Sequence, residues 1–149
     1  MRNLYFIALL ICCSLSVECS SVSSPAPPST PSSSANTSVS DDAIARAFEQ
    51  HKDLARVEGQ GVVRRLLSDD NSGSRHQRFV VALSSGQTLL ISHNIDLASK
   101  VVGLREGDLV SFCGEYAWNS EGGVIHWTHH DPSNHHAPGW IKHNGSVYQ

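Results

Sequence analysis

Residues 109–129 read LVSFCGEYAW, NSEG and GVIHWTH, and this stretch decides the fold that we expect. Two apolar runs flank the short polar segment 119–122, a pattern typical of a β-hairpin. With that segment as the loop, each residue of the strand 109–118 faces one residue of the strand 124–129. The facing pairs that this register predicts are Ala117–Val124, Tyr116–Ile125, Glu115–His126, Gly114–Trp127 and Cys113–Thr128.

The predicted register separates the side chains of the hairpin into two faces. The core face carries four large apolar side chains: Phe112, Tyr116, Ile125 and Trp127. Glu115 and His126 form an acid–imidazole pair on the outer face, close enough for the carboxylate to orient the ring. A surface pair without chemistry is the alternative. Cys113 also falls on the outer face, and because no imidazole faces it, we expect it to be passive.

Three further apolar runs precede the hairpin, at 62–67, 76–83 and 88–94, with turn-forming segments between them. Residues 95–104 are compatible with a short helix, and a longer helix is predicted from a cap at Ser40 to about Val57. Three strands, a short helix and two more strands is the order of an OB-type barrel. We therefore predict a mainly β domain, a five-stranded OB-like barrel with one N-terminal helix and a short helix between its third and fourth strands.

The N-terminal residues predict export. Arg2 precedes a short apolar run and then Cys19, which is typical of a signal peptide over residues 1–19. Residues 20–40 are mostly Ser, Pro, Thr and Ala, a composition typical of a disordered linker, so the barrel domain is assigned to 41–149. The expected location is periplasmic or secreted. An outer-membrane lipoprotein acylated at Cys19 is the alternative, and membrane contact is expected only in that case.

The charge of the chain disfavours one class of partner. Eleven basic and 14 acidic side chains give a formal charge of -3, and no block of Lys or Arg occurs. Because affinity for duplex nucleic acid comes from clustered cations, a duplex partner is disfavoured. The unusual residue is His, which occurs nine times, all from His51 onward. The oligomeric state is left open.

The histidines after residue 125 suggest a metal site. His126 and His130 would stand about 13 Å apart along one strand, so a single ion cannot join them. His129, His130 and Asp131 can ligate together only where the chain bends, which the following Pro132 favours. A further ligand is then needed from another segment, and the candidates are His93, His135, His136 and His143. Nitrogen and oxygen ligands suit a divalent metal such as zinc, copper or nickel. A hydrogen-bonded polar cap on the barrel is the alternative, with His135 and His136 on the loop surface.

The C-terminal residues 139–149 are too aromatic for a disordered end, and we expect them to pack on the domain. Trp140 is the candidate of this segment for a ligand site, although packing of its indole is the favoured interpretation.

Several long motifs resemble an uncharacterised family of bacterial exported domains, domain of unknown function 3465. They are the segments 66–70, 73–79, 85–91, 93–97, 107–108, 114–116, 122–132 and 139–143. The resemblance covers most of the chain beyond about Gln60. It implies a small exported domain, and it brings no established activity or catalytic residues.

Three functions follow from these patterns. The favoured one is a small exported binding module, whose His-rich edge takes a divalent metal or a small polar ligand, with Glu115, His126 and Trp140 as candidate contacts. The second is a hydrolase with a metal-activated water at His129, His130 and Asp131. The third is an oligosaccharide or single-stranded nucleic-acid binder of OB type. Whether the chain is an enzyme is left open, and the binding module without catalysis is the favoured interpretation.

Overall fold

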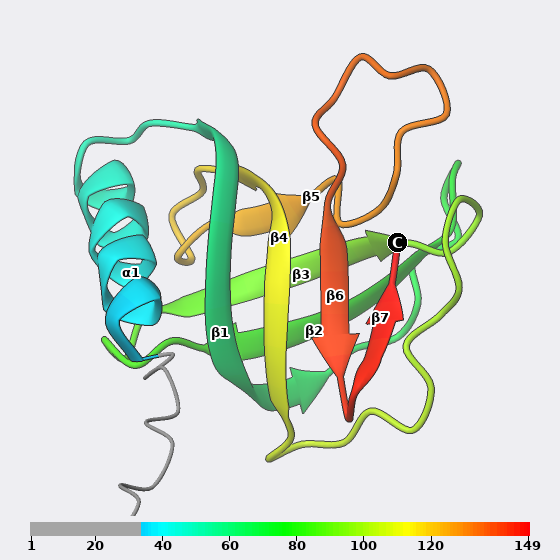
Figure 1. Ribbon diagram of the computed structural model, residues 1–149, viewed down its shortest axis with the longest axis horizontal. Coiled ribbons are helices and arrows are strands. Elements are labelled where there is room, and N and C mark those ends of the chain that lie inside the picture. The colour runs from blue at the N-terminus through cyan, green and yellow to red at the C-terminus, as the bar shows by residue number, and fades with distance from the viewer. Residues whose placement is uncertain (1–33) are drawn as a thin grey trace, which may run out of the picture. The chain divides into compact units, whose positions relative to one another are not determined.

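The computed structural model describes residues 34–149, which form one helix and a seven-stranded mixed sheet (Figure 1). The helix is α1 (Ser34–Glu49). The strands are β1 (Leu54–Leu66), β2 (His76–Ala82), β3 (Thr88–Asn94), β4 (Leu109–Ala117), β5 (Val124–His126), β6 (Trp140–His143) and β7 (Ser146–Tyr148). The predicted signal peptide and most of the predicted linker lie outside the described residues. From Ser34 onward no helix has the length and apolar character needed to cross a membrane.

The first five strands close into a barrel. The sheet runs in the order β1-β2-β3-β5-β4-β6-β7, and β1 pairs with β4 as well as with β2. The pair β3–β5 is parallel, and the other pairs are antiparallel. This closed five-stranded order agrees with the OB-like barrel that the sequence predicts.

The predicted β4–β5 register is confirmed, but β5 is shorter than expected. Glu115 faces His126, and the two preceding pairs are also those predicted. The strand ends at His126 because Trp127 adopts a φ of 49°, which is outside the extended region. The prediction of a strand through His129 is therefore wrong. We predicted that Trp127 lies on the core face, but its side chain is half-buried and does not belong to the core cluster.

The predicted helices differ from those observed. α1 begins at Ser34, within the stretch assigned to the linker, and it ends at Glu49 instead of near Val57. His51, with a φ of 53°, turns the chain, and Leu54 already begins β1. The long first strand therefore includes residues that we expected in the helix.

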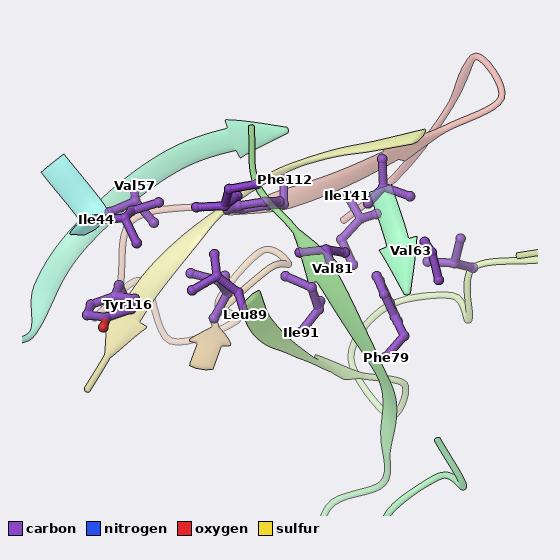
Figure 2. Packing of buried hydrophobic residues seen from close by; sticks show 14 of the residues in the cluster. Ile44, Val57, Val63, Phe79, Val81, Leu89, Ile91, Phe112, Tyr116 and Ile141 are labelled. Carbon is purple, nitrogen blue, oxygen red and sulfur yellow. The ribbon is translucent and has the colours of Figure 1, made fainter. Parts of the chain in front are cut away.

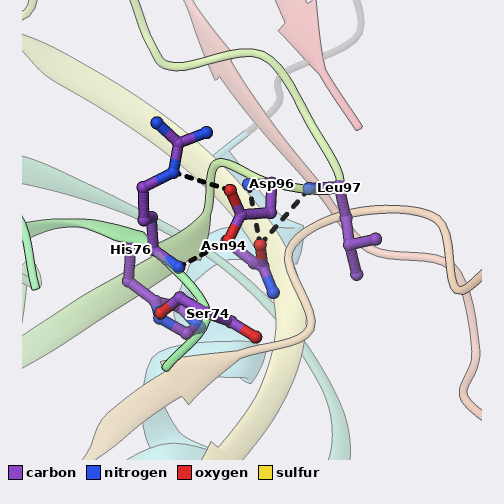
Figure 3. Close-up of polar contacts among 6 residues, drawn as sticks. Ser74, His76, Asn94, Asp96 and Leu97 are labelled. Atoms are coloured by element: carbon purple, nitrogen blue, oxygen red, sulfur yellow. Dashed lines mark hydrogen bonds and ion pairs between the residues drawn. The ribbon is translucent and has the colours of Figure 1, made fainter. Parts of the chain in front are cut away.

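The short helix predicted between β3 and β4 is absent, and turns occupy this segment. The side chain of Asn94 accepts hydrogen bonds from the backbone N–H groups of Asp96 and Leu97 (Figure 3). Asp96 in turn accepts from the backbone and the guanidinium of Arg75. The bonds to Asn94 are those of a helix N-cap, and one helical turn follows, in which the N–H of Ala98 bonds to the carbonyl of Asn94. The turn does not continue as a helix, because the backbone N–H and carbonyl of Val101 bond to the side chain of Gln77.

The core lies inside the barrel and extends under α1. Phe79, Leu89, Ile91, Phe112 and Tyr116 are almost inaccessible to solvent and face one another from different strands (Figure 2). Ile44 and Ala47 of α1 belong to the same cluster. The helix therefore supplies apolar side chains to the same core as the barrel.

The C-terminal segment packs on the domain, as predicted, and does so as two strands. Ile141 of β6 is fully buried and faces Phe112 of β4, and β7 extends the sheet beyond β6. The loop between β5 and β6 extends away from the barrel (orange in Figure 1). This loop carries His129, His130, His135 and His136, which are considered below.

Candidate functional site

Polar side chains form a row across the outer face of three neighbouring strands. Glu115 of β4 faces His126 of β5. The parallel pairing of Ile91 with Ile125 places Ser92 of β3 beside His126. Because Ile91 and Ile125 are buried and alternate side chains point to opposite faces, Ser92 and His126 point outward.

His126 is half-buried in this row, and its surroundings favour the uncharged ring. Burial lowers its pKa from the ordinary value of 6.5. The charge of His76 acts in the same direction, and the carboxylate of Glu115 opposes the shift. The ring is therefore available as a neutral donor and acceptor of hydrogen bonds near neutral pH.

The carboxylate of Glu115 takes a different partner from the one we expected. Its Oε1 lies 2.6 Å from Nδ1 of His136, so the imidazole donates this hydrogen bond. Both side chains are about one-third exposed, at 33% for His136 and 29% for Glu115. The prediction that His136 is plain loop surface is wrong, because it completes the polar row.

The ring of His136 also stacks on Trp127. The ring centroids are 3.6 Å apart and the planes differ by 11°. The ring of His129 lies on the same indole at 5.4 Å in a tilted orientation. Trp127 adopts a positive φ, which is uncommon for a bulky residue, and this conformation ends the strand where the stack begins. We call Ser92, Glu115, His126, Trp127 and His136 the wall cluster.

Asp131 fixes the loop that carries His136. Its carboxylate accepts hydrogen bonds from the backbone N–H groups of Ser133, His135 and His136, at 2.9, 2.7 and 3.0 Å. The bond from Ser133 is the largest contribution that lowers the pKa of Asp131, and those from His136 and His135 add to it. Asp131 is itself buried, so its oxygens serve the loop and do not face a ligand.

Buried polar residues at the start of the loop and on β3 connect the loop to the barrel. His93 is inaccessible to solvent and lies between the hydroxyl of Thr128, 2.8 Å from Nδ1, and the carbonyl of Ser99, 3.1 Å from Nε2. A carbonyl only accepts, so Nε2 carries the proton and Nδ1 accepts from Thr128. Burial lowers the pKa of His93 to about 4, and it stays neutral in the folded protein.

The residues predicted to bind a metal do not come together. His129 donates from Nδ1 to the carbonyl of His130, and the ring of His130 is exposed. His143 lies elsewhere and donates from Nε2 to Asp108, a hydrogen bond that is the main cause of the lowered pKa of Asp108. Within residues 34–149 no three His, Cys, Asp or Glu side chains are grouped to hold one ion. A zinc-type site therefore stays a prediction from the sequence.

Trp140 lies beside the wall cluster and is not part of it. It stands on β6, which follows β5 along the same edge of β4, and it faces Cys113, two residues before Glu115. The Nζ of Lys142 lies 4.2 Å from the centre of its ring. Cys113 lies on the outer face of β4, as predicted, but it is fully buried there. Gly139 packs against its backbone, and burial raises the pKa of its thiol to about 11. The thiol is therefore unreactive.

Sequence reasoning missed three members of the wall cluster. Ser92 gave no signal, Trp127 was assigned to the core, and His136 was considered only as a metal ligand or a surface residue of a loop. One signal was present for His136, because an Asp followed by Pro, Ser and Asn favours a turn closed by the Asp side chain. That turn returns the chain toward the strand and brings His136 back over Trp127.

The fold and site together define a small OB-like barrel domain with a polar side-chain cluster on its outer wall. Residues 29–149 match the family model described as "Protein of unknown function (DUF3465)", and the chain belongs to this family. The resemblance seen in the sequence motifs is thereby confirmed. Neither the curated proteins nor the solved structures contain a match.

Proposed function

We propose that this protein is an exported binding module, and that the wall cluster is its ligand-binding surface. The observation that carries the proposal is the joining of a polar row on three strands with a stacked indole and imidazole from the following loop. OB-type barrels commonly bind ligands on their outer strand faces and adjacent loops.

The construction of the loop supports a binding role. Asp131 and Thr128 of the loop and His93 of β3 are buried polar groups that hold the backbone of the loop against the barrel. The partly exposed carboxylate of Glu115 and the backbone of His136 are thereby in defined positions before any ligand arrives. Preorganised polar groups on rigid elements cost less entropy on binding than mobile ones.

The composition of the cluster favours a small polar ligand that contains a ring. It offers one carboxylate, two imidazoles, one hydroxyl and the face of an indole. These groups can stack against a ring of the ligand and form hydrogen bonds with the polar atoms at the edge of that ring. They lack the clustered Lys and Arg side chains that bind the phosphate backbone of a nucleic-acid strand. The hydrolase alternative has less support, since His129 and Asp131 already make hydrogen bonds within the loop.

Calorimetric titration with nucleosides and disaccharides tests this proposal. We expect the change Glu115→Gln or His126→Ala to weaken binding of any ligand found by about tenfold, the effect of one lost hydrogen bond. Lys142→Ala is the matched control and is expected to leave binding unchanged, because Lys142 pairs with Ser111, away from Glu115 on β4. Unchanged binding in both cluster variants, with circular dichroism unchanged, would place the binding surface elsewhere.

Export is a separate part of the proposal, supported by the charged and apolar start of the chain. Expression of the full chain in a Gram-negative host should give a processed protein in the periplasmic or culture fraction. Incorporation of labelled fatty acid that is lost on Cys19→Ala would show instead that the protein is anchored as a lipoprotein.

A further inference from the structure

His136 occupies its position as a small planar ligand would. Its ring lies parallel to the indole of Trp127, 3.6 Å away, and its Nδ1–H points in the ring plane to Oε1 of Glu115. The pair Trp127 and Glu115 therefore forms a stacking site: one face for a flat ring and one carboxylate at the edge of that ring. The imidazole is small and uses one of the two carboxylate oxygens.

We propose that this stacking site binds the guanine base of a nucleoside, which replaces the side chain of His136. This inference rests on the proposed function and names the class of ligand. Guanine presents two adjacent N–H donors, N1–H and the 2-amino group, which match the two oxygens of a carboxylate. Stacking of a base on an aromatic side chain is tolerant of sequence, so the carboxylate supplies the selectivity.

The chemistry of the carboxylate discriminates among purines. An ionised Glu only accepts hydrogen bonds. Adenine presents an acceptor nitrogen beside its amino group, which would face an oxygen of Glu115 unfavourably. Hypoxanthine keeps N1–H and lacks the 2-amino group, so it makes one of the two bonds. The expected order of affinity is guanosine, then inosine, then adenosine.

The exchange requires only the side chain of His136 to move. Its backbone N–H is held by Asp131 at 3.0 Å, so the loop keeps its shape when the ring rotates away. The ring is one-third exposed and can leave toward solvent. His126, which faces Glu115 across the strands, and Ser92 beside it then remain as partners for the sugar hydroxyls.

Titration of the purified protein with guanosine, inosine and adenosine tests the inference, with tryptophan fluorescence as the signal in a Trp140→Phe background. We expect guanosine to bind about tenfold more tightly than inosine, since one charge-assisted hydrogen bond distinguishes them. His136→Ala removes the competing ring and should tighten guanosine binding severalfold. Glu115→Gln should remove the preference for guanosine over adenosine, with the far-UV circular dichroism unchanged.

The outcomes separate this inference from the proposed function. Binding of a disaccharide at the wall cluster without binding of guanosine would overturn the guanine assignment and leave the proposed function intact. Guanosine binding that His136→Ala weakens would overturn the exchange, because the imidazole would then be a partner of the base. No binding by any nucleoside or disaccharide would count against both.

Discussion

At the scale of single residues, the candidate site depends on backbone positions that admit few side chains. Trp127 holds a φ of 49°, and a bulky residue in this region costs of the order of 1–3 kcal/mol. Such strain persists only where surrounding contacts enforce it, and here the stack with His136 and the buried neighbour Thr128 do so. The indole is thereby turned out of the barrel core.

Gly139 is a second such position, where the loop returns to the barrel. A Cβ at this residue would overlap the backbone oxygen of Trp127 and lie 2.5 Å from that of Cys113. We predict that Gly139→Ala lowers the free energy of unfolding by about 3 kcal/mol, since backbone cannot move aside cheaply. Chemical denaturation measures this change. The control is Gly73→Ala, which has open space and only a positive φ of 74°, and should cost about 1 kcal/mol. Equal losses of unfolding free energy in the two variants would show that the loop can move to make room for a Cβ at residue 139.

His93 gives the protein a predicted dependence on pH. Its pKa is lowered from 6.5 to about 4, chiefly by burial, so the unfolded chain binds a proton between these values that the folded protein does not bind. The free energy of unfolding therefore decreases as the pH falls from about 6.5 to about 4, by roughly 3 kcal/mol in total. Denaturation at several pH values, compared with His93→Gln, isolates this contribution. If the stability of the His93→Gln variant decreases with falling pH as steeply as that of the unchanged protein, His93 is not the cause of the pH dependence.

At the scale of elements, the sequence predicted strand pairing better than strand ends. The β4–β5 register follows from the length of the connecting loop and from the alternation of apolar and polar side chains along each strand, and both can be read from the local sequence. The end of β5 depends on Trp127, whose conformation is enforced by the loop packed over it, and the missing helix depends on Val101, whose backbone bonds to the distant side chain of Gln77. For the same reason the sequence paired Glu115 with His126 and did not place His136 beside Glu115, where a later turn brings it.

The loop between β5 and β6 is predicted to depend on the charge of Asp131. Asn at this position keeps one acceptor oxygen and turns its amide donor toward a second N–H group, so the bonds to Ser133, His135 and His136 cannot all form. We expect Asp131→Asn to destabilise the loop by about 1–2 kcal/mol and to speed amide hydrogen exchange at these residues. The control is Asp70→Asn, because the side chain of Asp70 accepts a hydrogen bond from only one backbone N–H group, that of Ser72. In this variant the amide exchange of Ser133, His135 and His136 should stay unchanged. Protection that survives in the Asp131 variant would assign the loop's order to other contacts.

The strand β6 is predicted to be part of the folding unit. Ile141 is fully buried against the barrel, whereas Val147 of β7 is 51% exposed. Ile141→Ala should lower the free energy of unfolding by about 3 kcal/mol, and Val147→Ala by less than about 0.5 kcal/mol. Thermal and chemical denaturation of both variants provide the comparison. Similar small effects would mean that β6 frays from the barrel before it unfolds.

At the scale of the whole molecule, β5 and β6 follow one another along one edge of β4, so their outward side chains form one continuous face. The wall cluster occupies the part of this face on β3, β4 and β5, and Trp140 and Lys142 occupy the part on β6. The sequence offered candidates in both parts, and their arrangement depends on the pairing of strands around the barrel. The first part has a carboxylate and two imidazoles beside an indole, and it is the one to which we assign binding.

The most direct test of this assignment is the mapping of amide and indole chemical shifts of the isotope-labelled protein during titration with the nucleoside and disaccharide panel. We predict that the ligand that binds shifts the amides of Ser92, Glu115 and His126 and the indole N–H of Trp127. Shifts confined to the indole of Trp140 and the amide of Lys142 would contradict this assignment and place binding on β6.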